Sequence, residues 1–445
     1  MGSSATDLKF RVSSPGLLRL PWDLPLEQWG PDTADLRELP VGPSRHLVRF
    51  PYVDGRLWAV KELPERVAGR EYAVLRQLET KDLPAVRAVG LAVQHASGNA
   101  LLVTRYLERS WQFRRLLMRL PPNRPLHRAR LLDAMANLLV DLHRNGVYWG
   151  DCSLANTLFS RDGQRLQAWL VDAETSEIHP ELSTGQRLDD LDIMVENVAG
   201  GLLDLAMMLD RPPEIHDQLL EEAAGVATRY HELWDVLTEQ PLLSYGDRHE
   251  VEGRIRRLNE LGFAVDELSL EPTGSGDERL RLKVTVAARR FHAVELFELT
   301  GLEVGEGQAQ VLLADLHSYV ATLPDTARGL QRGTSSVSRA EAVQRWMDEV
   351  LRPLMERAHE AVRRLGDPVQ AYCDLLEVRW LLSEQAGRDI GNTAALQALA
   401  NRSLPTDSAA MVVVAEEDTL DLARPTSEQL EALREGAAAT GDREG

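Results

Sequence analysis

Two acids and an amide near the middle of the chain have the types and spacing of a site that transfers phosphoryl groups. Asp151 and Asn156 lie five positions apart in GDCSLANTLF, and Asp172 follows the apolar run AWLV. In phosphoryl transfer to a hydroxyl, one Asp accepts the hydroxyl proton, an Asn at this distance holds Mg²⁺, and a later Asp holds the bridging metal. The pattern predicts Asp151 as the catalytic base and Asn156 and Asp172 as metal ligands.

The two upstream residues that this chemistry requires are present in the required order. Lys61 ends the strand-like segment LWAVK, and Glu71 opens the helical segment REYAVLRQL. In such a site a strand lysine holds the ATP phosphates, and a helix carboxylate orients the lysine. We therefore expect Lys61 and Glu71 to form an ion pair and to complete the catalytic set with Asp151.

Each of these residues also has a simpler structural interpretation. Lys61 could blunt an edge strand, Glu71 could stabilise the first turn of a helix, and the others could serve turns or caps. The agreement of five positions with the required order, and with the strands and helices between them, favours a protein-kinase-like fold.

Candidate nucleotide-binding residues lie before and after Lys61 and Glu71 in the sequence. Gly42 and Arg45 lie in LPVGPSRHLVRF, where a phosphate-covering loop belongs, and Arg45 or His46 is expected to offset the shortage of glycines there. Thr104 and Tyr106 lie in ALLVTRYL, the expected hinge for the adenine. These residues complete a predicted site for ATP.

Two departures from the protein-kinase pattern lie close to the predicted metal ligands. Glu174 follows Asp172 by two positions and is an additional metal ligand, a base or a strand residue that faces away. Ser153 replaces the lysine two positions after the catalytic Asp, so another cation must approach the γ-phosphate.

A charged cluster opens the helix that follows. We expect this cluster to cap the helix and to brace the catalytic loop through a buried ion pair; its members are Arg187, Asp189, Asp190 and Asp192. Cys152 has no histidine beside it in the sequence, which favours a packing role over a nucleophilic one.

The predicted elements place the candidate residues between two lobes. The sequence predicts an α+β protein, with a protein-kinase-like bilobal fold followed by a small α+β domain and a helical C-terminal region. The prolines at 212 and 213 mark the end of the second lobe. The expected parts are an N-terminal arm (1–43), an N-lobe (44–106), a C-lobe (107–211), an α+β domain (212–325), a helical region (338–404) and a disordered acidic tail (405–445).

The N-terminal arm allows two expectations. It carries Trp22 and Trp29 among prolines and polar residues. The arm is therefore irregular and either packs onto a domain through its tryptophans or stays disordered.

The charge balance limits the partners. The chain has 69 acidic and 50 basic side chains, a formal net charge of −19. This charge repels phosphate backbones and anionic membrane surfaces, so we expect no nucleic-acid partner and no stable membrane insertion. Only two cysteines occur, and no basic flank with an apolar core opens the chain, which predicts a cytoplasmic protein.

Three segments also resemble a known bacterial protein family. They are GDCSLANTLF, LVDAETSEIHPELSTGQRLDDLDI and EVRWLLSEQAGRDIG. The N-terminal part of that family is similar to the lipopolysaccharide (Kdo) kinases, and its C-terminal part is a domain of unknown function. The resemblance extends from about residue 45 to 405. It implies a protein-kinase-like fold with ATP and Mg²⁺ as ligands, and it names no substrate.

Two functions compete on these grounds. The first is an ATP-dependent phosphotransferase that acts on a hydroxyl of a small molecule, a sugar or a lipid-linked glycan. The second is a pseudokinase, a nucleotide-binding scaffold whose C-terminal domains bind a protein partner. The retained Asp151 and Asn156 favour the enzyme, because a pure scaffold does not use them.

Overall fold

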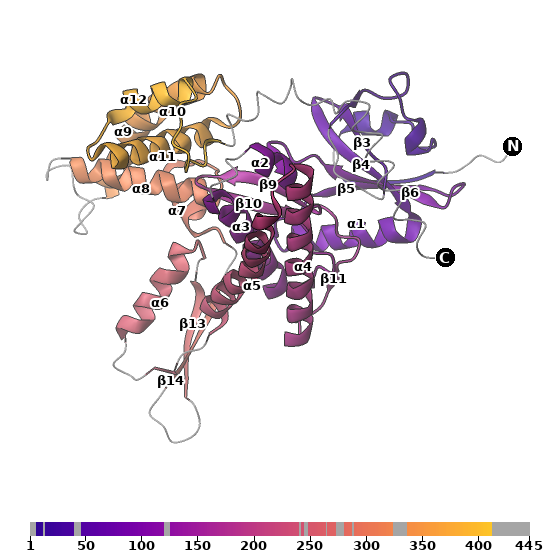
Figure 1. Ribbon diagram of the computed structural model, residues 1–445, viewed down its shortest axis with the longest axis horizontal. Coiled ribbons are helices and arrows are strands. Elements are labelled where there is room, and N and C mark those ends of the chain that lie inside the picture. Colours follow the sequence, from indigo (N-terminus) through magenta and orange to yellow (C-terminus); the bar gives the residue numbers. More distant parts are fainter. Residues whose placement is uncertain are drawn as a thin grey trace.

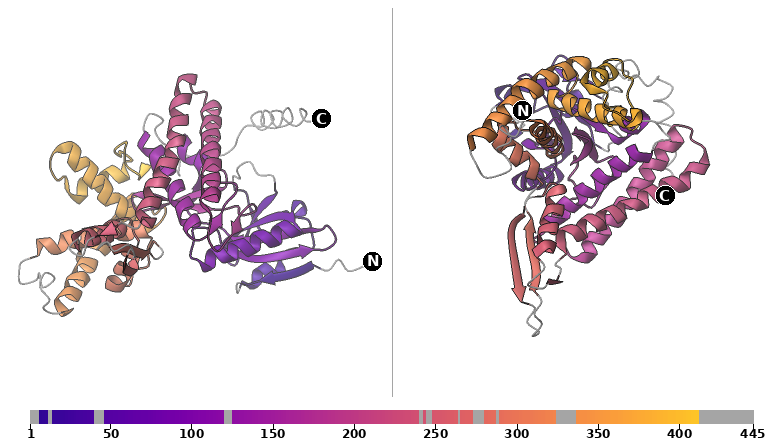
Figure 2. Two further views of the ribbon diagram at one scale, coloured as in Figure 1. Left: turned by 90° about the horizontal axis from the view of Figure 1, so that it is seen from below. Right: turned by 90° about the vertical axis from the view of Figure 1, so that its left-hand side faces the viewer.

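The computed structural model describes residues 6–11, 14–39, 46–119, 125–239, 242–243, 248–263, 265–272, 280–286, 289–323 and 336–411. A sheet-based N-lobe and a helical C-lobe form its first part, and the C-terminal helices lie on the side of the C-lobe away from the N-lobe (Figure 1). The view from below shows the same arrangement (Figure 2). This is the two-lobed α+β architecture with a helical C-terminal region that the sequence predicts.

The N-lobe is an antiparallel sheet with the strand order β1-β5-β6-β4-β3-β2. The hairpin turn at Asp54 and Gly55 has positive φ at both residues, 50° and 76°, which suits the twist of the flanking strands. The elements of this lobe are β1 (Thr6–Phe10), β2 (Leu36–Arg37), β3 (Val48–Val53), β4 (Arg56–Pro64), α1 (Glu65–Thr80), β5 (Ala88–Gln94) and β6 (Asn99–Arg105).

Alternate side chains of this sheet pack on its two opposite faces. Ala100 and Leu102 of β6 join the core that includes α1, whereas Leu101 and Val103 join a core with the N-terminal arm. Of the two expectations for the arm, packing through its tryptophans is confirmed for the described residues. The arm contains the short 3₁₀ helices η1 (Pro15–Arg19) and η2 (Leu26–Gln28), and its buried side chains include Leu17, Trp22, Leu26 and Trp29.

The C-lobe consists of packed helices and two small sheets, β10-β9-β7 and β11-β8. Its helices are α2 (Phe113–Arg119), α3 (Pro125–Arg144), α4 (Thr184–Met208), η3 (Pro213–Ile215) and α5 (His216–Thr238). Its strands are β7 (Ser110–Gln112), β8 (Val147–Tyr148), β9 (Thr157–Asp162), β10 (Arg165–Leu170) and β11 (Glu177–Ile178).

The expected boundary at residue 212 falls inside the C-lobe. Helix α5 packs on α3 and α4, and its buried side chains belong to the same core as theirs. These side chains are Leu219, Ala223, Val226, Tyr230 and Leu237. The two prolines end one helix, but the apolar stripe of the next helix continues the same core.

The C-terminal part joins a hairpin to a bundle of helices. The hairpin of β13 and β14 projects from the body of the molecule (Figures 1 and 2). The elements near it are β12 (Leu242–Leu243), α6 (Arg248–Glu260), β13 (Val265–Pro272) and β14 (Leu280–Val286). The bundle contains α7 (Phe291–Thr300), α8 (Glu306–Thr322), α9 (Ser336–Trp346), the π-helical turn η4 (Met347–Leu351), α10 (Arg352–Ala361), α11 (Pro368–Ala386) and α12 (Gly391–Ala400).

The expected α+β domain of residues 212–325 is therefore divided between two cores. Leu258 and Phe263 pack with the C-lobe, whereas α7 and α8 share one core with the helices from α9 onward. Side-chain packing, rather than position in the chain, decides which helix belongs to which core.

Hydrogen bonds hold the bundle to the end of the β9–β10 hairpin. The carboxylate of Asp162 accepts bonds from the backbone N–H groups of Gly307 (2.8 Å) and Gln308 (2.9 Å), at the first turn of α8. The side chain of Gln370 in α11 accepts a bond from Gly163 N (2.9 Å) and donates one to Gly163 O (2.8 Å). The bundle is thus docked on the C-lobe through specific polar contacts.

The start of the expected tail is also ordered by the bundle. Glu377 accepts hydrogen bonds from Ser408 Oγ (2.8 Å) and from Ala409 N (3.0 and 3.1 Å). Residues 405–411 therefore pack against α11, which the sequence-based boundary at 405 did not anticipate. Residues 412–445, the rest of the expected tail, lie outside the described residues.

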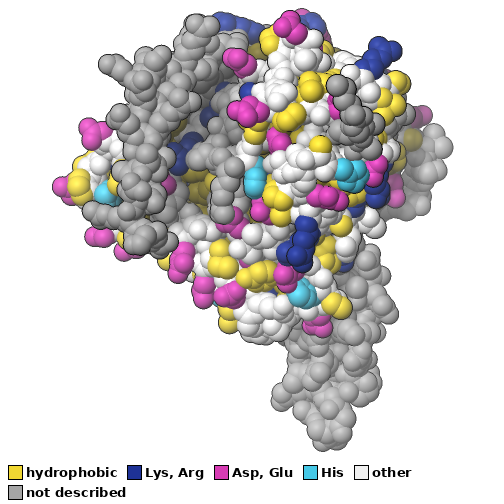
Figure 3. Space-filling model, turned by 90° about the vertical axis from the view of Figure 1, so that its right-hand side faces the viewer, with side chains coloured by type: hydrophobic (Ala, Val, Ile, Leu, Met, Phe, Trp, Pro, Cys, Tyr) yellow, Lys and Arg dark blue, Asp and Glu magenta, His cyan; other side chains and the backbone are white. Residues whose placement is uncertain are grey.

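The described surface mixes charges of both signs. On the face drawn in Figure 3, acidic side chains gather along the lower left edge, and basic ones stand singly or in small groups. Among the described residues, no helix combines the length and the apolar character that would let it cross a bilayer.

Candidate active site

Lys61 of β4 lies at the centre of a cluster of carboxylates between the lobes. Its Nζ is 3.2 Å from Oε2 of Glu71 on α1 and 2.7 Å from Oδ2 of Asp172. Oε2 of Glu174 is 4.0 Å from the same nitrogen. The predicted ion pair between Lys61 and Glu71 is present, and Glu174 lies beside the same lysine as the other two acids.

The cluster carries more negative charge than Lys61 offsets. Glu71 is only 1% exposed, and burial, together with the nearby charge of Asp172, raises its pKa to about 7. Burial alone would lower the pKa of Lys61, but the carboxylates of Glu71 and Asp172 outweigh it and raise the pKa. A cation that approached Asp172 would relieve the excess negative charge.

The catalytic loop brings Asp151 and Asn156 into direct contact. Asn156 Nδ2 donates hydrogen bonds to Asp151 Oδ2 (2.9 Å) and to the Asp151 carbonyl (3.2 Å). Val171 N donates to Asn156 O (3.1 Å), so this loop lies beside the residue that precedes Asp172. The five-residue spacing thus closes a turn that fixes the Asp151 carboxylate.

Asp190 of α4 holds the same loop from below. Its carboxylate, which is fully buried, accepts bonds from Trp149 N (2.7 Å), Gly150 N (2.8 Å) and Cys152 Sγ (3.0 Å). It also lies 3.0 Å from His143 Nε2. Burial alone would raise the pKa of Asp190, but these bonds lower it below its usual value, so the carboxylate stays ionised.

Asp190 braces the catalytic loop as expected, but its partner is His143, whose pKa is lowered by burial, so the contact is a buried hydrogen bond rather than the expected ion pair. The expected capping by the cluster is wrong, because Ser183 caps α4 and the cluster lies within the helix. His143 of α3 pairs with Asp190, while the guanidinium of Arg187 lies over the ring of Trp234, 4.0 Å from its centre. Asp189 is exposed and accepts a bond from the Tyr148 hydroxyl (2.7 Å).

Cys152 has the environment of a packing residue. Its thiol is completely buried, and burial, with the neighbouring Asp190, raises its pKa well above the usual value. A thiol held neutral in this way is a poor nucleophile. The expectation that Cys152 packs in the core is therefore supported by its surroundings.

The nucleotide-binding predictions concern the loop between β2 and β3 and the end of β6. Gly42 and Arg45 lie outside the described residues. His46 Nε2 is 3.1 Å from Oε2 of Glu174, so the end of this loop reaches the carboxylate cluster. Thr104 is near the end of β6, and the ring of Tyr106 packs edge-on against Phe50 of β3 at 5.7 Å. Tyr106 thus lies next to the strand that follows the loop, whereas Thr104 pairs with Ala59 of β4 and Ala88 of β5.

The donor atoms of the cleft suit magnesium. Asn156 uses its Nδ2 for Asp151, and this leaves Oδ1, the atom type that a hard cation binds, outside those bonds. Asp172 supplies a carboxylate. Within the described part of the chain, no group of three or more His, Cys, Asp or Glu is placed to hold a metal. Mg²⁺ in phosphoryl transfer is bound through one or two carboxylates and completes its shell with phosphates and water.

Two residues of this site belong to no motif and were not predicted. Asn197 of α4 donates through Nδ2 to Asp151 Oδ1 (3.4 Å) and to the Cys152 carbonyl (3.3 Å). His143, the partner of Asp190, is the second. Asn197 lies seven positions after Asp190, on the same face of one helix, and this spacing is a signal that could have found it.

Two family models match the chain, one on each half. Residues 54–202 match the Lipopolysaccharide kinase (Kdo/WaaP) family, and residues 232–404 match DUF4032, a domain of unknown function. This two-part architecture confirms the one suspected from the sequence, including its protein-kinase-like fold. No protein in the curated collection matches the chain.

Solved structures also show similar chains. One of them, described as "WaaP in complex with acyl carrier protein", has 21% sequence identity and a TM-score of 0.30. The match covers 45% of this chain and 88% of that one.

Proposed function

We propose that the protein is an ATP- and Mg²⁺-dependent phosphotransferase that acts on a hydroxyl of a small molecule, a sugar or a lipid-linked glycan. One observation carries the proposal: a lysine held between a helix carboxylate and a cleft carboxylate, beside a fixed pair of Asp151 and Asn156. The match of residues 54–202 to a lipopolysaccharide kinase family supports the same chemistry.

Each residue has a defined role in this proposal. Lys61, oriented by Glu71, binds the phosphates, and Thr104 and Tyr106 border the adenine. Asn156 and Asp172 supply oxygen ligands to Mg²⁺, which neutralises the charge that develops on the phosphates. Glu174 contributes a further metal ligand, and His46 beside it approaches the phosphates. Gly42 and Arg45 are assigned to the phosphate-covering loop.

Asp151 orients the acceptor hydroxyl and takes its proton late in the transfer. The carboxylate is suited to this role because Asn156 and Asn197 hold it through both of its oxygens. Bound in this way, it has a fixed direction toward the cleft while remaining a proton acceptor.

The short segment after the metal ligand favours a small acceptor. Only residues 173–183 separate Asp172 from the start of α4, and part of this segment forms β11. Protein kinases use a longer segment here to dock peptides, so a protein acceptor is disfavoured. A cytoplasmic location would give the enzyme access to ATP, and the C-terminal part remains available for a protein partner.

The substitution Asp151→Asn tests the proposal. The variant should lose transfer by at least about 1,000-fold and bind ATP almost as wild type does, because Asp151 touches the acceptor rather than the nucleotide. The measurement follows label from γ-labelled ATP into small molecules of a protein-depleted cell extract. Asp192→Asn, an exposed acid on α4, is the control.

Two outcomes would contradict the proposal. Equal label in the products of wild type and Asp151→Asn would show that Asp151 is not the base. No label with either protein, in extracts that contain the native acceptor, would favour the alternative function, a nucleotide-binding scaffold.

A further inference from the structure

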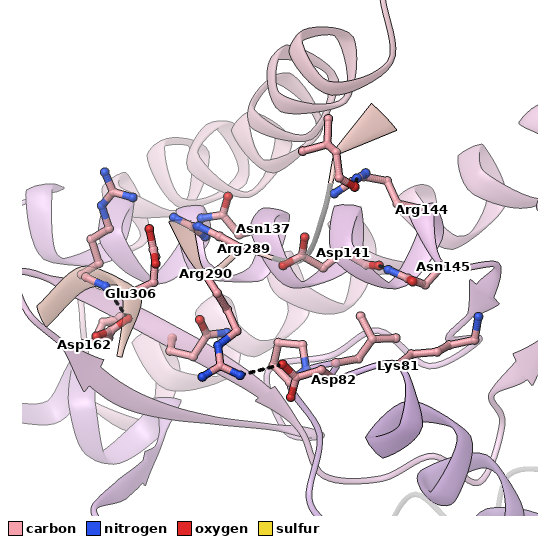
Figure 4. A pocket seen from close by; sticks show the side chains of 17 residues that line it. Lys81, Asp82, Asn137, Asp141, Arg144, Asn145, Asp162, Arg289, Arg290 and Glu306 are labelled. Carbon is pink, nitrogen blue, oxygen red and sulfur yellow. Dashed lines mark hydrogen bonds and ion pairs between the residues drawn. The ribbon is translucent and has the colours of Figure 1, made fainter. Parts of the chain in front are cut away.

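A second pocket lies away from the cleft, where the C-lobe meets the C-terminal part. It has a volume of about 300 Å³, and its walls come from the loop after α1, from α3, from the β9–β10 hairpin and from the segments that flank α7. We call it the junction pocket. Figure 4 shows Asn137, Asp141, Arg144 and Asn145 along α3, with Arg289 and Arg290 from the C-terminal part.

The wall formed by α3 is polar where a packed helix is usually apolar. Asn137, Asp141, Arg144 and Asn145 follow each other at intervals of four, three and one, so they share one face of the helix. Elsewhere on α3 the buried side chains are mostly apolar. A polar stripe that faces a cavity between two parts of a protein indicates a site for a polar ligand.

Most acidic residues that line the pocket already have hydrogen-bond or ion-pair partners, whereas several basic residues have few. Five lining residues are basic and four are acidic, in a chain whose net charge is −19. Three of the acids already have partners. Asp82 pairs with Arg290 (3.4 Å), Asp162 caps α8, and Glu306 accepts bonds from His292 N (3.0 Å) and Ala293 N (2.9 Å).

Among the described lining residues, three arginines remain without an ion pair, and Asp141 is the one lining acid for which no hydrogen bond or ion pair through its side chain is present. Arg144 donates a single bond to the Val286 carbonyl (2.9 Å), and Arg289 donates a single bond to the Leu261 carbonyl (2.9 Å). Each guanidinium has five N–H donors, so most donors of both remain. The ring of Phe263 lies under both, 5.2 Å from Arg144 and 5.9 Å from Arg289.

Arg165 is the third of these arginines. Its backbone belongs to the β9–β10 ladder, but its side chain has no hydrogen bond or ion pair in the described part of the chain, and it lines the same pocket. Although part of Arg165 is exposed, desolvation and the neighbouring charge of Arg289 lower its pKa, and they outweigh the acids Asp162, Glu306 and Asp133, which act in the opposite direction. Like charges held this close are stabilised when an anion lies between them.

We infer that the junction pocket binds a phosphorylated small molecule of about the size of a sugar phosphate. Arg144, Arg165 and Arg289 bind the phosphate, because planar guanidinium groups match phosphate oxygens in pairs. The amides of Asn137, Asn145 and Gln167, with Asp141, bind the hydroxyls. A pocket of about 300 Å³ has room for a molecule of that class.

The pocket is placed to link this ligand to both halves of the chain. One wall is the loop that follows α1, the helix that carries Glu71, and Pro84 O in this loop accepts a bond from Leu170 N (2.9 Å), two residues before Asp172. Another wall contains Arg289 and Glu306 from the DUF4032 segment. The ligand would therefore stabilise the contact between the two segments.

Calorimetric titration of the full chain tests the inference, without ATP or Mg²⁺ and at fixed ionic strength. The probes are glucose 6-phosphate, inorganic phosphate and glucose. We expect glucose 6-phosphate to bind more tightly than phosphate, and glucose to give no signal. Arg165→Gln and Arg289→Gln should each weaken binding by about tenfold or more, since each removes charge-assisted hydrogen bonds.

Two further variants give the controls. Arg56→Gln is matched to Arg165→Gln, because Arg56 is also an exposed arginine at the start of the second strand of a hairpin, and it should leave binding unchanged. Lys61→Met should also retain binding, because it alters only the cleft. This separates the inference from the proposed function, whose failure would not change the titration.

The inference fails on any of three results. These are no binding of either phosphate-containing probe at millimolar concentration, unchanged binding by Arg165→Gln and Arg289→Gln, or loss of binding by Lys61→Met alone. Equal affinity for phosphate and glucose 6-phosphate would support an anion site but overturn the sugar-phosphate assignment.

Discussion

Two buried acids of this protein differ in what surrounds them. Asp190 has four donors within 3.0 Å, all from the chain itself, and is kept ionised by them. Glu71 is equally buried but shares one lysine with Asp172, and its pKa rises to about 7. The first centre is complete within the fold, whereas the second holds an excess of negative charge. Asp190 therefore has a structural role, whereas the carboxylates of Glu71 and Asp172 are arranged to bind a cationic ligand.

The largest effect is expected at the complete centre. Asp190→Ala should lower the free energy of unfolding by about 3–5 kcal/mol, because it leaves His143 and two backbone N–H groups buried without an acceptor. Urea unfolding measures this. The neighbouring exposed acid gives the matched control, and Asp189→Ala should cost less than about 1 kcal/mol. Similar losses for the two variants would contradict the bracing role.

In the cluster around Lys61, removal of an acid should not destabilise the ligand-free protein, in contrast to the effect expected for Asp190→Ala. Asp172→Asn should leave the ligand-free protein as stable as wild type or more so, because it removes one of the acids around Lys61. It should also abolish most of the stabilisation by ATP and Mg²⁺, about 2.7 kcal/mol for wild type at 100 times the dissociation constant. Thermal unfolding with and without ligand measures both. Full ligand stabilisation of the variant would remove Asp172 from the metal site.

The pH dependence of stability should report on Glu71. Its folded pKa of about 7 lies above the value of 4.5 for an unperturbed Glu, so the folded state binds the proton more tightly. The stability of wild type relative to Glu71→Gln should therefore fall as pH rises from about 4.5 to 7, by on the order of 3 kcal/mol, and should be constant outside this window. In an Asp172→Asn background the pH range of this change should narrow, because the charge of Asp172 no longer raises the pKa of Glu71. A relative stability that rises with pH would contradict the assigned shift.

The smallest effect is expected where the two centres meet. Asn197 links Asp151 to the carbonyl of Cys152, which lies next to the Asp190 network. Its bonds are long, so Asn197→Ala should cost only about 0.5–1.5 kcal/mol of stability. The rate of transfer should fall several-fold without a change in ATP affinity. Unchanged kinetics would show that Asn156 alone is enough to orient Asp151.

The cleft could be predicted from the sequence because its signals are local. Asp151 and Asn156 lie in one loop, and Lys61 and Glu71 lie on consecutive elements, so spacing and periodicity already bring each pair together. The brace could be predicted only in part. Asp190 is part of a charged cluster that the sequence shows. His143 lies 47 residues earlier on another helix, and no motif around it indicates a contact with Asp190.

The domain boundaries could not be predicted because tertiary packing decides them. A proline pair near 212 ends a helix, but the core continues into α5. Strand β1, with the sequence TDLKF, alternates polar and apolar residues over only five positions, which is too short to identify a strand, and it joins the sheet only as an edge beside β5. The assignments of Gly42 and Arg45 stay predictions.

The hydrogen bonds between Asp162 and the start of α8 also bear on how the chain is made. Their donors are encoded 145 and 146 residues after the acceptor. At a synthesis rate of about 5–20 residues per second, the C-lobe waits roughly 7 to 30 s for them. During that interval the end of the β9–β10 hairpin is an open surface that chaperones can bind. The kinase-like half therefore completes its fold only when most of the chain has left the ribosome, and the two halves mature as a single product.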